Sequence, residues 1–124
     1  MLKSIGTDIV EIERLSKDVE QYGDRFLSRV LSSEEISIYE KRADKAQFLA
    51  GRFAAKEAIV KALGHYLKDK PPLNTIVITN TDSGTPIVNF SDEITSKLIG
   101  VTCLISISHE KNYAVAMATF VEEK

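Results

Sequence analysis

Residues 50–64, AGRFAAKEAIVKALG, predict a helix built mainly from alanine and large apolar residues. The apolar pattern follows the helical repeat of about 100° per residue and extends the helix from about Lys45 to Leu63. Gly64 then stands where a C′ glycine commonly follows a helix. Because this helix has no fully polar face, we expect the rest of the chain to pack around it.

The segments on either side of this helix predict an α+β fold. Before the helix the sequence indicates one strand and three short helices, and after it mostly strands joined by turns with glycine or proline. The expected strands are residues 6–14, 74–80, 87–90, 101–108 and 113–121, and the expected short helices are residues 14–23, 24–31, 32–42 and 91–100. This order indicates an antiparallel sheet packed against one long helix and several short helices. We expect a single domain over residues 1–124.

Three of the short helices carry recognisable N-terminal signals. Ser32 and Glu35 have the spacing of a capping box. Asp24 and Ser91 stand where N-cap residues are expected for the second and the fourth short helix.

The composition narrows the class of protein. The chain has 124 residues, a net charge of −2 and a pI of about 5.7, which argues against general nucleic-acid binding. No apolar run approaches the roughly 20 residues that cross a bilayer, so we expect no membrane span. The N-terminal residues include no cleavable apolar stretch, which favours a cytoplasmic protein. Cys103 is the single cysteine and is better explained as a buried apolar residue than as a nucleophile.

Four charged residues of the long helix lie in unexpected places. Arg52 and Lys56 fall inside its apolar arc, where long side chains could extend past core residues to reach water. Glu57 and Lys61 lie opposite, among alanines. They could form an ordinary surface pair four residues apart, or face a site that small neighbours leave accessible.

Two further polar positions suggest a site. Asp8 shares strand parity with Gly6 and apolar residues, so it is either a satisfied aspartate at a strand edge or a ligand for a hard cation. Ser108 and His109 end a strand, where binding groups often lie. Adjacent strand residues point to opposite faces, which argues against a serine-hydrolase triad. The glycine-containing turns match neither a P-loop nor a dinucleotide-binding motif.

Five segments taken together resemble the holo-(acyl-carrier-protein) synthases, the small 4′-phosphopantetheinyl transferases of fatty-acid synthesis. They are IGTDIVEIERL, FLSRVLSSEE, FLAGRFAAKEAIVKALG, SGTP and ISISH, in this order along almost the whole chain. The first and the third of these segments are the specific ones. The resemblance implies the phosphopantetheinyl transferase fold and transfer of 4′-phosphopantetheine from coenzyme A to a serine of apo-acyl carrier protein, with release of adenosine 3′,5′-bisphosphate.

The resemblance also implies the roles of individual residues. Asp8 and Glu57 would be the ligands of Mg²⁺, and Lys61 would contact the phosphates and assist the leaving group. The serine proton would pass to a metal-associated water or to Glu57. Coenzyme A would be bound by Arg52, Lys61, Gly64, Gly84, Pro86, Ser108 and His109. The family is typically trimeric, with sites between subunits.

The acidic carrier protein would dock on basic residues, for which we predict Arg14, Arg25 and Arg29. Phe26 could add an apolar contact there or belong to the core. The sequence departs from the family at His65 and Tyr66, which replace a glycine-rich loop, and at two further positions, Thr85 and Glu110.

Two other functions remain open from the sequence. The chain could be a non-catalytic module that binds acyl carrier protein or coenzyme A, although intact Asp8, Glu57 and Lys61 argue against it. It could also be another magnesium-dependent phosphotransferase that acts on a nucleotide without a carrier protein.

Overall fold

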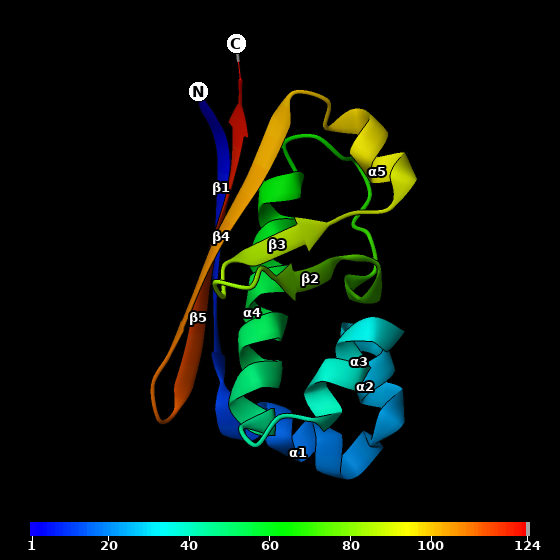
Figure 1. Ribbon diagram of the computed structural model, residues 1–124, viewed down its shortest axis with the longest axis vertical. Helices are drawn as coiled ribbons and strands as arrows, with labels where there is room; N and C mark the ends of the chain where they lie inside the picture. Colours follow the sequence, from blue (N-terminus) through cyan, green and yellow to red (C-terminus); the bar gives the residue numbers. More distant parts are fainter. Residues whose placement is uncertain (124) are drawn as a thin grey trace.

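The computed structural model describes residues 1–123 (Figure 1). The elements in chain order are β1 (Leu2–Glu11), α1 (Ile12–Tyr22), α2 (Asp24–Val30), α3 (Ser33–Glu40), α4 (Lys45–Leu63), the 3-10 helix η1 (Leu73–Thr75), β2 (Val77–Asn80), β3 (Pro86–Asn89), α5 (Asp92–Lys97), β4 (Val101–His109) and β5 (Tyr113–Glu122). The predicted long helix therefore has the expected bounds.

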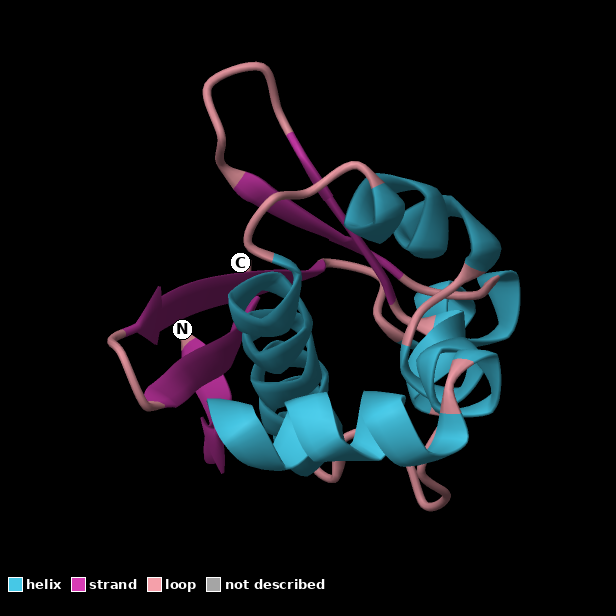
Figure 2. Cartoon of the chain, turned by 90° about the horizontal axis from the view of Figure 1, so that it is seen from below, coloured by secondary structure: helices cyan, strands magenta, loops and turns pink. Residues whose placement is uncertain are grey.

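The strands form two antiparallel groups. β1, β5 and β4 make a three-stranded sheet in the order β1-β5-β4, so that β1 and β4 are its two edges. β2 and β3 pair only with each other, and this ribbon lies beside β4. The sheet covers one side of α4, and the short helices lie on its other side (Figures 1 and 2). The predicted α+β architecture is confirmed. Among residues 1–123, no helix is long and apolar enough to span a bilayer.

Small side chains let α4 approach the sheet closely. Ala50, Ala54, Ala58 and Ala62 are spaced one helical turn apart and are all buried, as are the alanines of the facing strand β5. At Gly6 of β1 the contact is closest, because a Cβ atom there would overlap the Ala58 carbonyl oxygen and lie 3.0 Å from the Ala62 nitrogen. This close contact fixes the distance between the backbones of β1 and α4.

A buried ion pair joins α4 to the layer of short helices. The Lys56 ammonium donates to Glu35 Oε1 at 2.6 Å and to the Val30 carbonyl at 2.7 Å, and both charged side chains are fully buried. The second Glu35 oxygen accepts from the Ile78 N–H of β2 at 2.9 Å. The expectation that Lys56 reaches water past the core is wrong. Its charge is balanced by Glu35 inside the protein. Desolvation lowers the pKa of Lys56, and the hydrogen bond and charge of Glu35 oppose part of this shift.

The predicted helix ends are partly correct. Ser32 and Glu35 form the capping box, and the Ser91 side chain accepts from the Ile94 N–H as an N-cap. Asp24 is not an N-cap, because it is already the first residue of α2. Gly64 is the C-cap of α4 with φ −55°, one position before the predicted C′ place. The chain instead continues into a turn at residues 65 and 66.

Candidate functional site

The edge of the sheet at β1 carries a carboxylate paired with α4. Asp8 Oδ1 accepts from Lys61 Nζ at 3.1 Å, and the same ammonium donates to the Thr7 carbonyl at 2.9 Å. The Asp8 side chain is 18% exposed and that of Lys61 is 56% exposed. Asp8 is therefore a partly buried strand aspartate, satisfied by a lysine that is itself accessible from solvent.

Backbone spacing gives the approximate position of Glu57 relative to Asp8. β1 and α4 run in opposite directions (Figure 1), and Gly6 contacts α4 between Ala58 and Ala62. A step of two residues along β1 from Gly6 covers about 6.6 Å. The same distance spans roughly four residues of α4, counted towards its N-terminus. This step leads from the Ala58–Ala62 turn to the turn that holds Glu57. We call Asp8, Glu57 and Lys61 the β1-edge cluster.

The chemistry of the β1-edge cluster suits a hard divalent cation. Asp8 and Glu57 offer carboxylate oxygens as ligands, and the Lys61 ammonium adds a positive charge beside them. Among residues 1–123 there is no group of three or more histidine, cysteine, aspartate or glutamate side chains that could hold a metal by itself. A cation held by Asp8 and Glu57 would have to complete its coordination with water or with the oxygens of a bound phosphate, as Mg²⁺ commonly does.

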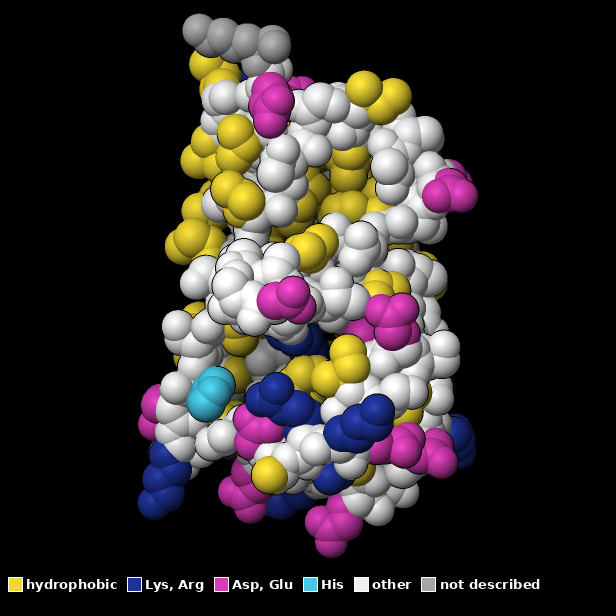
Figure 3. All heavy atoms as spheres, in the orientation of Figure 1, with side chains coloured by type: hydrophobic (Ala, Val, Ile, Leu, Met, Phe, Trp, Pro, Cys, Tyr) yellow, Lys and Arg dark blue, Asp and Glu magenta, His cyan; other side chains and the backbone are white. Residues whose placement is uncertain are grey.

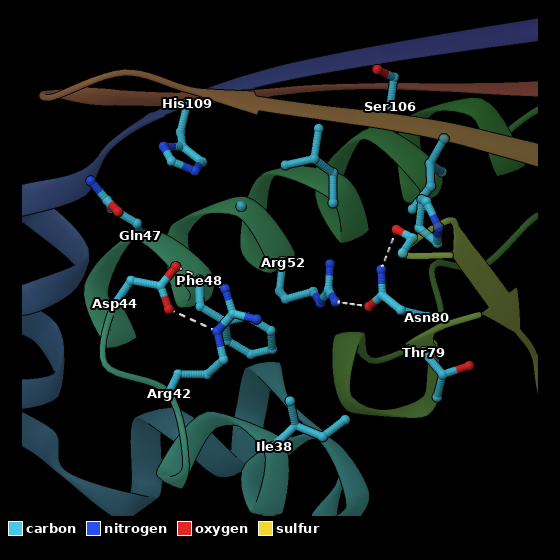
Figure 4. A pocket seen from close by; sticks show the side chains of 15 residues that line it. Ile38, Arg42, Asp44, Gln47, Phe48, Arg52, Thr79, Asn80, Ser106 and His109 are labelled. Carbon is cyan, nitrogen blue, oxygen red and sulfur yellow. Dashed lines mark hydrogen bonds and ion pairs between the residues drawn. The ribbon is translucent and has the colours of Figure 1, made fainter. Parts of the chain in front are cut away.

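The opposite edge of the sheet carries a cavity of about 760 Å³ between α4, β4 and the β2–β3 ribbon (Figure 4). We call it the β4-edge pocket. Its charged or basic lining side chains are Arg42, Asp44, Arg52 and His109, so positive groups outnumber the single carboxylate. The remaining lining is polar or apolar, with Phe48 on α4. The pocket therefore favours an anionic ligand with a flat, partly apolar portion.

Arg52 provides a buried cationic group in this pocket. The residue is 8% exposed, its Nη2 donates to Asn80 Oδ1 at 2.6 Å, and its guanidinium lies 4.7 Å from the centre of the Phe48 ring. Burial lowers the pKa of Arg52, but arginine stays charged. Its buried Nε has no hydrogen-bond partner in the described chain.

Asn80 connects Arg52 to the turn after β2. Its amide nitrogen donates to the Gly84 carbonyl at 2.9 Å while its oxygen accepts from Arg52 (Figure 4). Gly84 has φ +88°, a backbone conformation that glycine adopts without strain. Asn80 thus holds both the guanidinium and the turn in place. The sequence analysis did not single out Asn80, although it ends a predicted strand, where binding groups are common.

The predicted coenzyme-binding residues fall into separate places. Arg52, Gly84, Pro86 and His109 line the β4-edge pocket. Lys61 and Gly64 line a smaller cavity of about 230 Å³ beside the loop after α4, away from that pocket. Ser108 lies on the outer, exposed face of the sheet and does not line the pocket. The structure therefore brings together four of the seven residues within one subunit.

The β1-edge cluster and the β4-edge pocket lie on opposite sides of one subunit. β5 separates β1 from β4, so the two edges are about 10 Å apart across the strands alone. α4 contributes Arg52 to one side and Lys61 to the other. Within a single subunit, one ligand would therefore have to pass around α4 to reach both groups.

The outer face of the three-stranded sheet is apolar and exposed. It includes Ile5, Ile9, Leu104, Val115 and Met117, each at least 43% exposed. In Figure 3 hydrophobic side chains follow the left edge of the molecule, where this face lies. Exposed apolar side chains gathered on one face in this way commonly mark an interface, although serine and threonine lie among them here.

Two of the predicted carrier-binding arginines share a groove between α1 and α2. Arg25 and Arg29 line a cavity of about 330 Å³ together with Asp18, Tyr22 and Phe26. Arg14 lies on α1 outside the lining of this groove. Phe26 is half-buried and packs against the core while also reaching the groove, so both of its predicted roles are compatible with its position.

Cys103 faces the inner side of the sheet and is half-buried. Desolvation raises its thiol pKa to about 12, so very little thiolate exists at neutral pH. This agrees with the prediction of a structural rather than a nucleophilic cysteine.

Comparisons with known proteins identify the family. Residues 4–118 match the 4′-phosphopantetheinyl transferase superfamily, so the chain belongs to this family of enzymes. The chain is 44% identical over 115 residues to holo-(acyl-carrier-protein) synthase of Shewanella oneidensis, covering 90% of the chain and 91% of that protein. It is 43% identical over 118 residues to the synthase of Dechloromonas aromatica, covering 94% of each.

Solved structures of the same family share this fold. The synthase of Neisseria meningitidis superposes with a TM-score of 0.88 at 29% identity, covering 98% of this chain and 100% of that chain. The synthase of Helicobacter pylori, solved in complex with coenzyme A, gives a TM-score of 0.82 at 33% identity, covering 94% and 99% respectively. The synthase of Bacillus anthracis, whose complex is described as CoA (3′,5′-ADP), gives 0.81 at 34% identity, with 99% coverage of both chains. The resemblance inferred from the sequence motifs is confirmed.

Proposed function

We propose that this protein transfers 4′-phosphopantetheine from coenzyme A to a serine hydroxyl of apo-acyl carrier protein and releases adenosine 3′,5′-bisphosphate. The observation that carries the proposal is the pairing of Asp8 with Lys61, which lies one helical turn after Glu57 on α4, in a chain of this family. The relatives named as carrier-protein synthases and the two solved with coenzyme A support the choice of substrates. We expect the reaction to take place in the cytoplasm.

We propose Mg²⁺ as the cofactor, with Asp8 and Glu57 as its protein ligands. Two carboxylates suit this ion because it commonly takes its other ligands from phosphate oxygens and water. When bound, it would neutralise charge on the diphosphate of coenzyme A. Lys61 would then be released from Asp8 and free to contact the phosphates.

The chain's own residues would guide the transfer. Lys61 is more than half exposed and can move its ammonium towards the leaving phosphate, where it would stabilise the developing negative charge or donate a proton. The serine oxygen of the carrier would attack the phosphorus of the pantetheine phosphate, and the bond to the departing adenosine 3′,5′-bisphosphate would break. Glu57 or a bound water would accept the serine proton. No covalent enzyme intermediate is needed.

We propose that the nucleotide portion of coenzyme A occupies the β4-edge pocket. Arg52 supplies positive charge to the pocket, His109 stands at the strand end, and Phe48 supplies an apolar surface. Gly84 and Pro86 form the wall on the β2–β3 ribbon. Ser108 would take part only from the outer sheet face of a neighbouring subunit.

We propose a trimer whose sites lie between subunits. The β1-edge cluster and the β4-edge pocket are on opposite edges, and the sheet between them has an exposed apolar face. In a closed ring of identical subunits, one edge of each chain meets the other edge of the next. One coenzyme A could then reach the cluster of one subunit and the pocket of its neighbour.

The direct test is a transfer assay read by mass spectrometry. Incubating the protein with coenzyme A, Mg²⁺ and apo-acyl carrier protein should add one phosphopantetheine to the carrier serine, and omitting the metal should stop the reaction. A carrier that keeps its original mass after prolonged incubation would support the alternative of a non-catalytic binding module.

The carrier protein should dock on the groove between α1 and α2. Replacing Arg25 with glutamate should raise the KM for acyl carrier protein about tenfold, because a rim charge is reversed opposite an acidic partner. The KM for coenzyme A should change less than twofold. Steady-state kinetics with each substrate varied in turn would measure both values, with Glu40→Gln as a control outside the groove. Equal rises in the two KM values would indicate a different docking face.

A further inference from the structure

We propose that Asp44 competes with the ligand phosphate for Arg42 and so limits how tightly the β4-edge pocket holds a phosphorylated nucleotide. The inference rests on the proposed function, in which this pocket takes the nucleotide portion of coenzyme A. It adds two residues, Arg42 and Asp44, to which the sequence analysis gave no role.

Arg42 is placed to act on a bound anion. Its guanidinium lies 4.9 Å from the centre of the Phe48 ring, the same ring that Arg52 contacts at 4.7 Å. Both arginines line the pocket (Figure 4). Lys45 Nζ donates to the Arg42 carbonyl at 2.7 Å and thereby fixes the loop before α4. Two guanidinium groups beside one aromatic ring suit a doubly charged phosphate better than one guanidinium group would.

Arg42 is paired with Asp44. Its Nε donates to Asp44 Oδ1 at 2.7 Å and its Nη2 to Oδ2 at 2.8 Å, which is a two-pronged arginine–carboxylate pair. The hydrogen bond from Arg42 is the main reason that the pKa of Asp44 is lowered, so Asp44 is charged at neutral pH. A phosphate that enters the pocket must therefore displace or share this carboxylate.

Helix capping does not explain why Asp44 lies beside Arg42. It occupies the N-cap position of α4, but its side chain makes no capping hydrogen bond. It is also the only carboxylate among the residues that line the pocket. A carboxylate placed here weakens binding of the nucleotide product and would favour its release after transfer.

The test compares binding of adenosine 3′,5′-bisphosphate and of 5′-AMP by titration calorimetry. Asp44→Asn preserves shape, removes one negative charge and frees Arg42. The affinity for the bisphosphate should rise about 3- to 10-fold, within the range for a charge-assisted contact that is partly exposed to solvent. The affinity for 5′-AMP, which has one phosphate fewer, should rise less. Glu20→Gln, which removes an exposed charge on α1 far from the pocket, should change neither.

A double variant separates competition from simple repulsion. In the Arg42→Gln background, Asp44→Asn should change the bisphosphate affinity less than twofold, because the Arg42 guanidinium that Asp44 binds is no longer present. An equal gain with and without Arg42, or no gain from Asp44→Asn alone, would overturn the inference while leaving the pocket assignment intact. Failure of the wild-type protein to bind the bisphosphate would instead overturn the proposed role of the pocket, and the inference with it.

Discussion

Replacing Glu57 with glutamine is expected to slow metal-dependent transfer by at least about 100-fold, because a ligand charge worth several kcal/mol to the transition state is lost. Glutamine has the same shape and a similar helix propensity, so the unfolding temperature should stay within about 2 °C of the wild type. The measurement is the rate of carrier modification by mass spectrometry over a range of Mg²⁺ concentrations.

The metal dependence distinguishes a ligand from a general base. If Glu57 binds the ion, the variant should need more Mg²⁺ to reach half of its own maximal rate, and Asp8→Asn should behave in the same way. Lys61 pairs with Asp8 in this structure, so Lys61→Met tests a phosphate contact without removing a ligand. A wild-type rate for Glu57→Gln at limiting Mg²⁺ would contradict the assignment.

The second large effect is expected at Gly6, which places β1 against α4. A methyl group there would overlap the Ala58 carbonyl oxygen, and backbone cannot move aside as a side chain can. Gly6→Ala should lower the free energy of unfolding by about 2–4 kcal/mol, at the upper end for an overpacked contact. It should also reduce transfer strongly, because Asp8 lies two residues further along the displaced strand.

Gly51→Ala is the matched control for this variant. A Cβ atom at Gly51 would meet only the Ile107 Cγ2 methyl group, at 3.0 Å, which is a side-chain atom and not backbone. Alanine also favours the helix by about 1 kcal/mol over glycine. Urea denaturation should therefore show a loss for Gly6→Ala and little change for Gly51→Ala. Equal stability of Gly6→Ala and wild type would mean that the strand does not lie against the helix as described.

The sequence predicted the fold well where local chemistry determines structure. The capping box of Ser32 and Glu35 and the bounds of α4 follow from spacing that has a direct physical cause. Gly64 lies one position from its predicted place at the helix end, and the sequence does not show that the chain continues through a turn after α4. The pairing order β1-β5-β4 depends on contacts between distant segments, which a single sequence does not reveal.

Polar residues in apolar positions marked candidate site residues but did not distinguish binding from structure. Asp8, Arg52 and Lys56 gave the same signal. Asp8 pairs with an exposed lysine and Arg52 lines a cavity, whereas Lys56 is neutralised by Glu35 inside the core. This difference depends on a partner 21 residues away in the chain. Arg42 and Asp44 gave no signal at all, because charged residues in a loop are ordinary.

In the proposed trimer, each site combines the β1-edge cluster of one subunit with the β4-edge pocket of another. Glu57→Gln damages only the cluster, and Arg52→Gln damages only the pocket. Unfolding the two variants together and refolding them should produce mixed trimers in which some sites receive both intact halves. Random mixing in equal amounts leaves about one site in four intact in a cyclic trimer, so activity should recover to about a quarter of the wild-type value.

The decisive measurement is the transfer rate of this co-refolded mixture, compared with each variant refolded alone and then mixed. Recovery only after co-refolding is the predicted result. If the site were contained in one subunit, every chain would carry a defect, and the co-refolded mixture would be no more active than the average of the two variants. That outcome would contradict the account.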